Sequence, residues 1–157
     1  MKAIYYFTTL ISLFFLFGCF DKTNQNVHNE EASLPDQLKD KVAGLMVINS
    51  SINTKKQTTS VLYGNQKAIE RITDNDSVMR TGEKFIRITW NQKPDPNWIG
   101  AVIPGKLISF ETLELLSEKE PVLYQKIEGN PMQVKKDTLG NLKNIKFILH
   151  QKMAVLP

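Results

Sequence analysis

The chain has 157 residues and a formal net charge of +4, and it contains two histidines and one cysteine. Its basic residues are scattered and do not form a stripe with aromatic side chains, so the composition does not favour nucleic-acid binding. One cysteine excludes an intramolecular disulfide and leaves too few thiols for a zinc site built from cysteines.

The N-terminus has the pattern of an export signal. Lys2 precedes an uncharged apolar run over residues 3–17, and the small residue Gly18 then precedes Cys19. The run is shorter than the roughly 20 residues that span a membrane, which argues against a transmembrane anchor. The segment resembles the lipobox of bacterial lipoproteins, which implies cleavage before Cys19 and a lipid on its sulfur. We therefore expect a signal peptide over residues 1–18.

The segment over residues 20–33 that follows the cysteine is polar, so residues 19–33 are expected to form a flexible tether. His28 lies in it, and we expect a solvated histidine there rather than a metal ligand. Because Phe20 and not Asp follows the cysteine, the lipoprotein resemblance favours an outer-membrane anchor facing the periplasm. The folded domain is expected over residues 34–157, long enough to bury a core without disulfides.

Two helices are expected near the start of this domain. Apolar residues recur at spacings of three and four over residues 34–46, and Pro35 suits the first turn of a helix. Asn65 is a candidate N-cap for a shorter helix over residues 65–72.

From residue 84 onward the apolar period changes to two, which predicts β-strands. The expected strands are 84–91, 98–103, 107–116, 122–127 and 145–151, with proline- and glycine-containing turns between them. Short strands separated by turns predict an α+β fold, a mainly antiparallel β-sheet domain with one or two packing helices.

The densest group of candidate site residues surrounds a Pro-Asp-Pro corner between Trp90 and Trp98. The two prolines fix φ, and Asp95 is placed to accept hydrogen bonds from nearby backbone amides. Gly100, on an expected strand, predicts the close approach of another group. Two interpretations stay open, because the tryptophans are either core anchors around a rigid turn or ligand-facing residues.

Several motifs lie between residue 45 and the C-terminus. They are Tyr63-Gly64-Asn65, Trp90-x-Gln92, Asp95-Pro96-x-Trp98-x-Gly100-x-x-Ile103-Pro104-Gly105, Ser109-x-Glu111 and Ile148-Leu149-x-Gln151-x-x-Ala154-Val155-x-Pro157. Together they resemble the cytochrome P-460 family of exported proteins. The resemblance implies a compact antiparallel β domain and, in haem-bearing members, a c-type haem held by a C-terminal Cys-x-x-Cys-His.

This chain lacks that haem motif. Two thioether bonds need two thiols, so covalent haem attachment is excluded. Outside the tether the only histidine is His150, and alternation over 145–151 predicts that it is exposed rather than an axial or metal ligand. We therefore expect no metal site and no haem cofactor.

The sequence thus predicts a non-catalytic binding or interaction module, attached to the membrane through Cys19. Its candidate ligand-facing or core residues are Tyr63, Trp90, Asp95 and Trp98. The alternative is a redox protein that binds haem noncovalently, through His150, and acts on small nitrogen compounds or peroxide. The sequence does not identify a small-molecule or protein partner.

Overall fold

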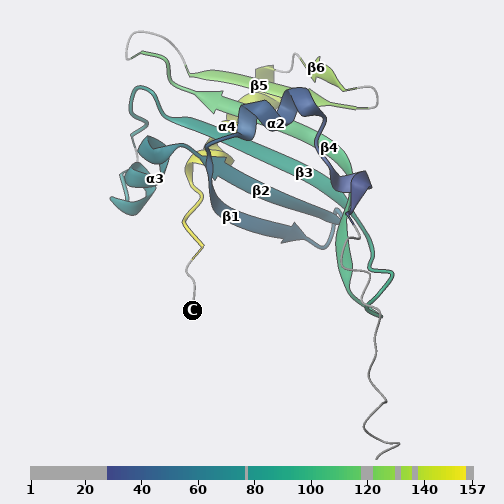
Figure 1. The fold of residues 1–157 in the computed structure, drawn as a ribbon. Coiled ribbons are helices and arrows are strands. Elements are labelled where there is room, and N and C mark those ends of the chain that lie inside the picture. The colour runs from purple at the N-terminus through teal and green to yellow at the C-terminus, as the bar shows by residue number, and fades with distance from the viewer. Residues whose placement is uncertain (1–27, 77, 118–121, 130–131, 136–137, 155–157) are drawn as a thin grey trace, which may run out of the picture.

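The computed structural model describes residues 28–154, apart from residues 77, 118–121, 130–131 and 136–137 (Figure 1). The expected signal peptide and Cys19 lie outside the described residues. The centre of the fold is a six-stranded sheet whose strands follow chain order, β1-β2-β3-β4-β5-β6. The fold is therefore α+β with a mainly antiparallel sheet, as predicted.

All five strand pairs are antiparallel, and short connections suffice between antiparallel neighbours. The elements in chain order are η2 (Glu30–Ala32), α2 (Asp36–Val42), β1 (Met46–Asn53), β2 (Thr58–Gly64), α3 (Gln66–Thr73), β3 (Lys84–Pro94), β4 (Val102–Glu114), β5 (Leu123–Glu128), β6 (Gln133–Lys135) and α4 (Thr138–Leu149). No helix among the described residues is long and apolar enough to cross a membrane.

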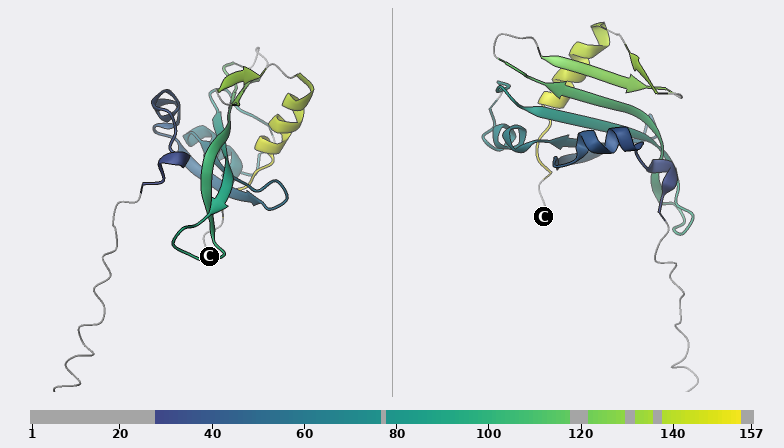
Figure 2. Two further views of the ribbon diagram at one scale, coloured as in Figure 1. Left: turned by 90° about the vertical axis from the view of Figure 1, so that its right-hand side faces the viewer. Right: turned by 45° about the horizontal axis from the view of Figure 1, so that its top comes forward.

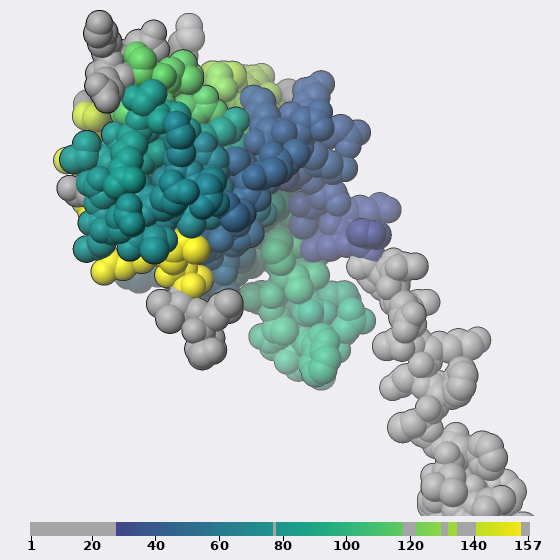
Figure 3. Space-filling model, turned by 60° about the vertical axis from the view of Figure 1, so that its left-hand side comes forward, coloured from purple at the N-terminus to yellow at the C-terminus, as the bar shows by residue number. Residues whose placement is uncertain are grey.

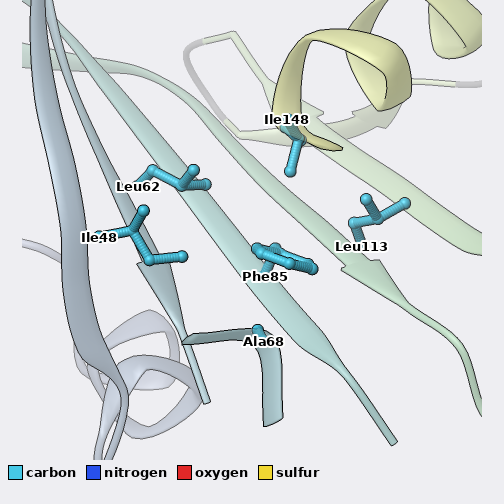
Figure 4. Packing of buried hydrophobic residues seen from close by; sticks show 6 residues of the cluster. All are labelled: Ile48, Leu62, Ala68, Phe85, Leu113 and Ile148. Atoms are coloured by element: carbon cyan, nitrogen blue, oxygen red, sulfur yellow. The ribbon is translucent and has the colours of Figure 1, made fainter. Parts of the chain in front are cut away.

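The helices α2 and α4 lie on opposite faces of the sheet (Figure 2). Successive side chains of a strand point to opposite faces, so β3 contributes to a core on each side. On the α4 side the buried residues are Ile48, Leu62, Ala68, Phe85, Leu113 and Ile148 (Figure 4). On the α2 side they are Leu38, Ile86, Ile88, Trp90 and Phe110.

Both predicted N-terminal helices are present. The first is shorter than expected and ends at Val42, since the chain turns at Gly44, which has a φ of +76°. The second begins after Asn65, whose side chain accepts a hydrogen bond from the backbone N–H of Ala68 at 3.1 Å. This is the N-cap interaction that the sequence predicted.

Two predicted strands are wrong, and three strands were not predicted. Residues 145–149 belong to α4, because Ile145, Ile148 and Leu149 contact the core at helical spacing. Residues 98–101 form the turn that precedes β4. The strands β1 and β2, which form one edge of the sheet, and the short strand β6 at the other edge were missed.

The strands β3 and β4 extend beyond their neighbours as a two-stranded arm. Pairing of β2 with β3 ends at Asn91, and pairing of β5 with β4 begins at Ser109. In the segments after Asn91 and before Ser109, strands β3 and β4 pair only with each other, for example Lys93 with Ile103. The arm projects from the body of the molecule (Figure 3).

Candidate functional site

The sheet face under α4 changes from apolar to polar along its strands. Side chains two residues apart on a strand lie on the same face of the sheet. Moving two residues along each strand therefore leads from the apolar core into this polar area. The changes are Leu62 to Ser60 on β2, Phe85 to Arg87 on β3 and Leu113 to Glu111 on β4. Because these strands are in register, the polar side chains meet in one place.

A pocket of about 340 Å³ lies over this polar area. This volume is within the range of small-molecule sites, which is about 300–1,000 Å³. Its walls come from β1 to β5 and from α4, and they include Ser51, Asn53, Thr58, Ser60, Thr89, Ile108, Ser109, Asn144 and Phe147. Hydroxyl and amide groups dominate the lining, and Ile108 and Phe147 add two apolar side chains.

The floor of the pocket is an ion pair between Arg87 and Glu111, which face each other across β3 and β4. The Arg87 Nη2 atom is 2.8 Å from Oε1 and 2.7 Å from Oε2 of Glu111. Both side chains are largely enclosed, with exposures of 15% and 2%. The guanidinium also lies over the Phe147 ring, 4.7 Å from its centre, and so joins the sheet to α4.

Two further donors hold the Glu111 carboxylate. The Tyr124 hydroxyl donates to Oε2 at 2.7 Å, and the Ser109 hydroxyl donates to Oε1 at 3.4 Å. Burial raises the pKa of the Tyr124 hydroxyl, and its hydrogen bond to the carboxylate raises that pKa further. Glu111 therefore serves as a fixed counter-ion whose oxygens are already occupied.

The remaining charge of the pocket is positive. Besides Arg87, its lining includes Lys56, Lys126 and Lys143, and the only carboxylate among the lining residues is Glu111. Lys126 forms an ion pair with Glu128. Among the residues that the structure describes, neither Lys56 nor Lys143 makes an ion pair, so their charges can act on a ligand.

The predicted site residues do not gather at this pocket. Trp90 is 8% exposed, and its indole N–H donates to the Ala32 carbonyl at 2.9 Å, so the core interpretation is confirmed for this residue. Tyr63 packs at the margin of the same core, on the face opposite the pocket. Burial raises the pKa of the Tyr63 hydroxyl.

Asp95 and Trp98 lie at the tip of the arm. The Asp95 Oδ1 atom accepts a hydrogen bond from the Asn97 amide at 2.8 Å, as predicted. Trp98 is 72% exposed, so the core interpretation is wrong for this residue. Gly100 was expected to permit a close approach, but nothing lies within 4 Å of the position its Cβ would take. Its φ of +82° explains the glycine instead.

His150 follows the last residue of α4 and is exposed, as predicted, although it follows a helix and does not lie on a strand. Its Nδ1 atom lies 2.6 Å from the Lys146 carbonyl oxygen. Within the described part of the chain, no group of three or more side chains is arranged to bind a metal ion.

Sequence reasoning missed the residues that build the pocket floor. Arg87 alternates with Ile86 and Ile88, a pattern that indicates a solvent-facing residue on a half-buried strand. Its partner Phe147 was placed on a strand, so the helix that covers this face was not expected. The pairing of Arg87 with Glu111 depends on the register of β3 and β4, which the sequence pattern does not specify.

No protein-family model matches the chain, and the search of curated proteins found no match. The function is therefore inferred from the pocket and from the N-terminal sequence.

Proposed function

We propose that the chain is a lipid-anchored binding module of the cell envelope, and that its pocket under α4 binds a small anionic molecule. The observation that carries this proposal is the charge of the pocket lining. Lys56 and Lys143, whose charges are not paired among the described residues, lie beside a floor on which the only lining carboxylate, that of Glu111, already pairs with Arg87. A carboxylate or phosphate group on the ligand complements that charge.

The floor is suited to binding because it is rigid before the ligand arrives. Arg87 is fixed by two oxygens of Glu111 and by the ring of Phe147. A preorganised site loses less conformational entropy on binding than a mobile one. Ile108 and Phe147 offer apolar contacts, so the ligand class is a small organic anion with an apolar part.

The proposal includes the membrane address expected from the sequence, with cleavage after residue 18 and a lipid on Cys19 in the outer membrane, facing the periplasm. The relationship to the cytochrome P-460 family is part of the same proposal and rests on the sequence motifs. A redox protein with noncovalent haem has less support, since His150 does not line the pocket under α4.

Nuclear magnetic resonance titration tests the pocket directly. Residues 20–157 include every contact described above, and this form is titrated with benzoate, citrate, inorganic phosphate and the neutral sugar glucose. We expect benzoate or citrate to shift the amide signals of Ser109, Asn144 and Phe147, and glucose to leave them unchanged. The double substitution Lys56→Gln and Lys143→Gln should weaken the binding of the anion by about tenfold or more.

The matched control is the double substitution Lys39→Gln and Lys41→Gln on α2, which lies on the other face of the sheet. It removes the same charge from the protein and should leave anion affinity unchanged. Equal weakening by both double variants would show a general charge effect and contradict a specific site. Anion shifts confined to residues outside the pocket would also contradict the proposal.

A further inference from the structure

The tip of the β3–β4 arm exposes large apolar side chains. Trp98 is 72% exposed, Val102 is 51% exposed and Ile99 is fully exposed. These residues are neighbours in the turn and at the start of β4, so they form one apolar tip. Contiguous exposed apolar surface that includes an aromatic ring marks an interaction site more often than isolated exposed residues do.

The turn holds these side chains away from the body of the protein. The Asp95 N–H donates to the Ala101 carbonyl at 2.9 Å, and the Ala101 N–H donates to the Trp98 carbonyl at 3.1 Å. Gly100 supplies the left-handed backbone conformation that closes the turn. The apolar side chains are therefore presented on an ordered hairpin end that projects from the sheet (Figure 3).

The chain enters the domain beside this arm. The Asn29 side chain donates to the Pro104 carbonyl at 2.6 Å, and Glu31 pairs with Lys93 at 2.6 Å. Between Cys19 and these contacts lie residues 20–28, which span at most about 3.5 Å each, or roughly 30 Å in total. A lipid on Cys19 therefore keeps the arm within about 30 Å of the membrane surface.

We propose that the apolar tip of the arm inserts into the interfacial layer of the bilayer in which the Cys19 lipid is anchored. This inference rests on the lipid anchor of the proposed function and adds a second membrane contact to it. Tryptophan prefers the membrane–water interface, because its ring is apolar while its N–H remains hydrated. Lys106, exposed on the same arm, can face lipid phosphates.

The second contact orients the domain. A lipid at the end of a tether holds the protein near the membrane but leaves it free to rotate. Insertion of the arm fixes one end of β3 and β4, and the pocket under α4 is built on the same two strands. The mouth of the pocket is then held at a constant orientation to the membrane.

The test uses the lipid-free form, residues 20–157, with vesicles of phosphatidylethanolamine and phosphatidylglycerol. We expect the protein to sediment with the vesicles and Trp98 fluorescence to be quenched by lipids brominated near the headgroup. The double substitution Trp98→Ser and Ile99→Ser should weaken sedimentation by about tenfold or more. The control Leu142→Ser, which removes an exposed apolar side chain of α4, should change neither result.

Three outcomes would overturn the proposal. One is the absence of vesicle binding by the lipid-free form together with no quenching of Trp98 when the acylated protein is placed on brominated vesicles. Another is binding that survives the double substitution. The third is concentration-dependent self-association that Trp98→Ser removes, which would make a second copy of the chain the occupant. Acyl labelling of Cys19 is measured separately, so failure of the arm and failure of the lipid anchor are distinguishable.

Discussion

Arg71 and Glu83 form an ion pair that is almost completely enclosed, with Nε 2.8 Å from Oε2 and side-chain exposures of 2% and 0%. The second oxygen of Glu83 accepts a hydrogen bond from the Arg80 N–H at 3.0 Å, and Arg71 Nη1 donates to the Asp76 carbonyl at 2.9 Å. The guanidinium lies 5.4 Å from the centre of the Phe85 ring. The pair therefore ties α3 and the loop after it to the residue before β3.

Removal of either partner leaves a buried charge without its counter-ion. We expect Glu83→Ala and Arg71→Ala each to lower the free energy of unfolding by about 3–5 kcal/mol. The control Lys39→Ala breaks the exposed pair with Asp36 and should leave the free energy of unfolding nearly unchanged. Denaturant titration measures all three, and a similar small loss for each would contradict the structural role of the buried pair.

The two tryptophans should differ sharply in their contribution to stability. Trp90 is buried, so Trp90→Ala should lower the free energy of unfolding by about 3–5 kcal/mol. Trp98 is exposed at the arm tip, so Trp98→Ala should change stability by no more than about 0.5 kcal/mol. Denaturant titration of both variants would contradict this assignment if their losses were equal.

The sequence predicted correctly those elements in which the apolar residues follow one clear spacing or in which a capping residue marks the start of a helix. Alternation of Ile86, Ile88 and Trp90 placed β3, and Asn65 marked the start of α3. The strands β1 and β2 were missed because polar residues occupy the face where a core would require apolar ones. Those residues, which include Ser51 and Ser60, line the pocket. Because the pocket is lined by polar side chains of these two strands, the strands lack the alternation of apolar residues from which they could have been predicted.

The helix α4 was missed for a different reason. Its last turns contain a short apolar segment interrupted only by Lys146, Ile145-Lys146-Phe147-Ile148-Leu149, in which a strand and a helix cannot be separated by period alone. Ile148 is fully buried, whereas Phe147 lies over Arg87 in the pocket. Likewise, no local pattern distinguishes an aromatic residue of the core, such as Trp90, from one displayed on a turn, such as Trp98.

The lipid attachment is testable with one substitution. Since Cys19 provides the only thiol of the chain, Cys19→Ala should abolish labelling by radioactive acyl chains. Each buried methylene of an acyl chain contributes about 0.8 kcal/mol to membrane binding, so the apolar tip alone should bind membranes weakly and reversibly and should not hold the protein in a washed membrane fraction. The variant should leave the membrane fraction or remain an uncleaved precursor. Persistent labelling of Cys19→Ala would contradict the lipobox interpretation.

The Tyr124 hydroxyl, which donates to Glu111 in the pocket floor, should ionise only at alkaline pH. Residues 20–157 contain two tyrosines, Tyr63 and Tyr124, and the pKa of each is raised above the ordinary value of about 10. The phenolate absorbance of the folded protein should therefore increase only above pH 10. In the variant Tyr63→Phe, the remaining titration belongs to Tyr124, and it should stay shifted to high pH because burial and the Glu111 carboxylate disfavour the phenolate.

The raised pKa of Tyr124 determines the direction in which the free energy of unfolding changes with pH. The folded state retains the Tyr124 proton at pH values where the unfolded state loses it, so the unfolded state binds fewer protons and the free energy of unfolding falls as pH rises. The contribution of Tyr124 is complete below about pH 10 and is lost as pH rises through the folded pKa. We expect Tyr124→Phe to lose about 1.5–3 kcal/mol near neutral pH, for the hydrogen bond to the Glu111 carboxylate, and to show a smaller further loss above pH 10. Denaturant titrations at several pH values measure both effects, and Tyr124 ionisation near pH 10 in the folded Tyr63→Phe variant would contradict the enclosed site.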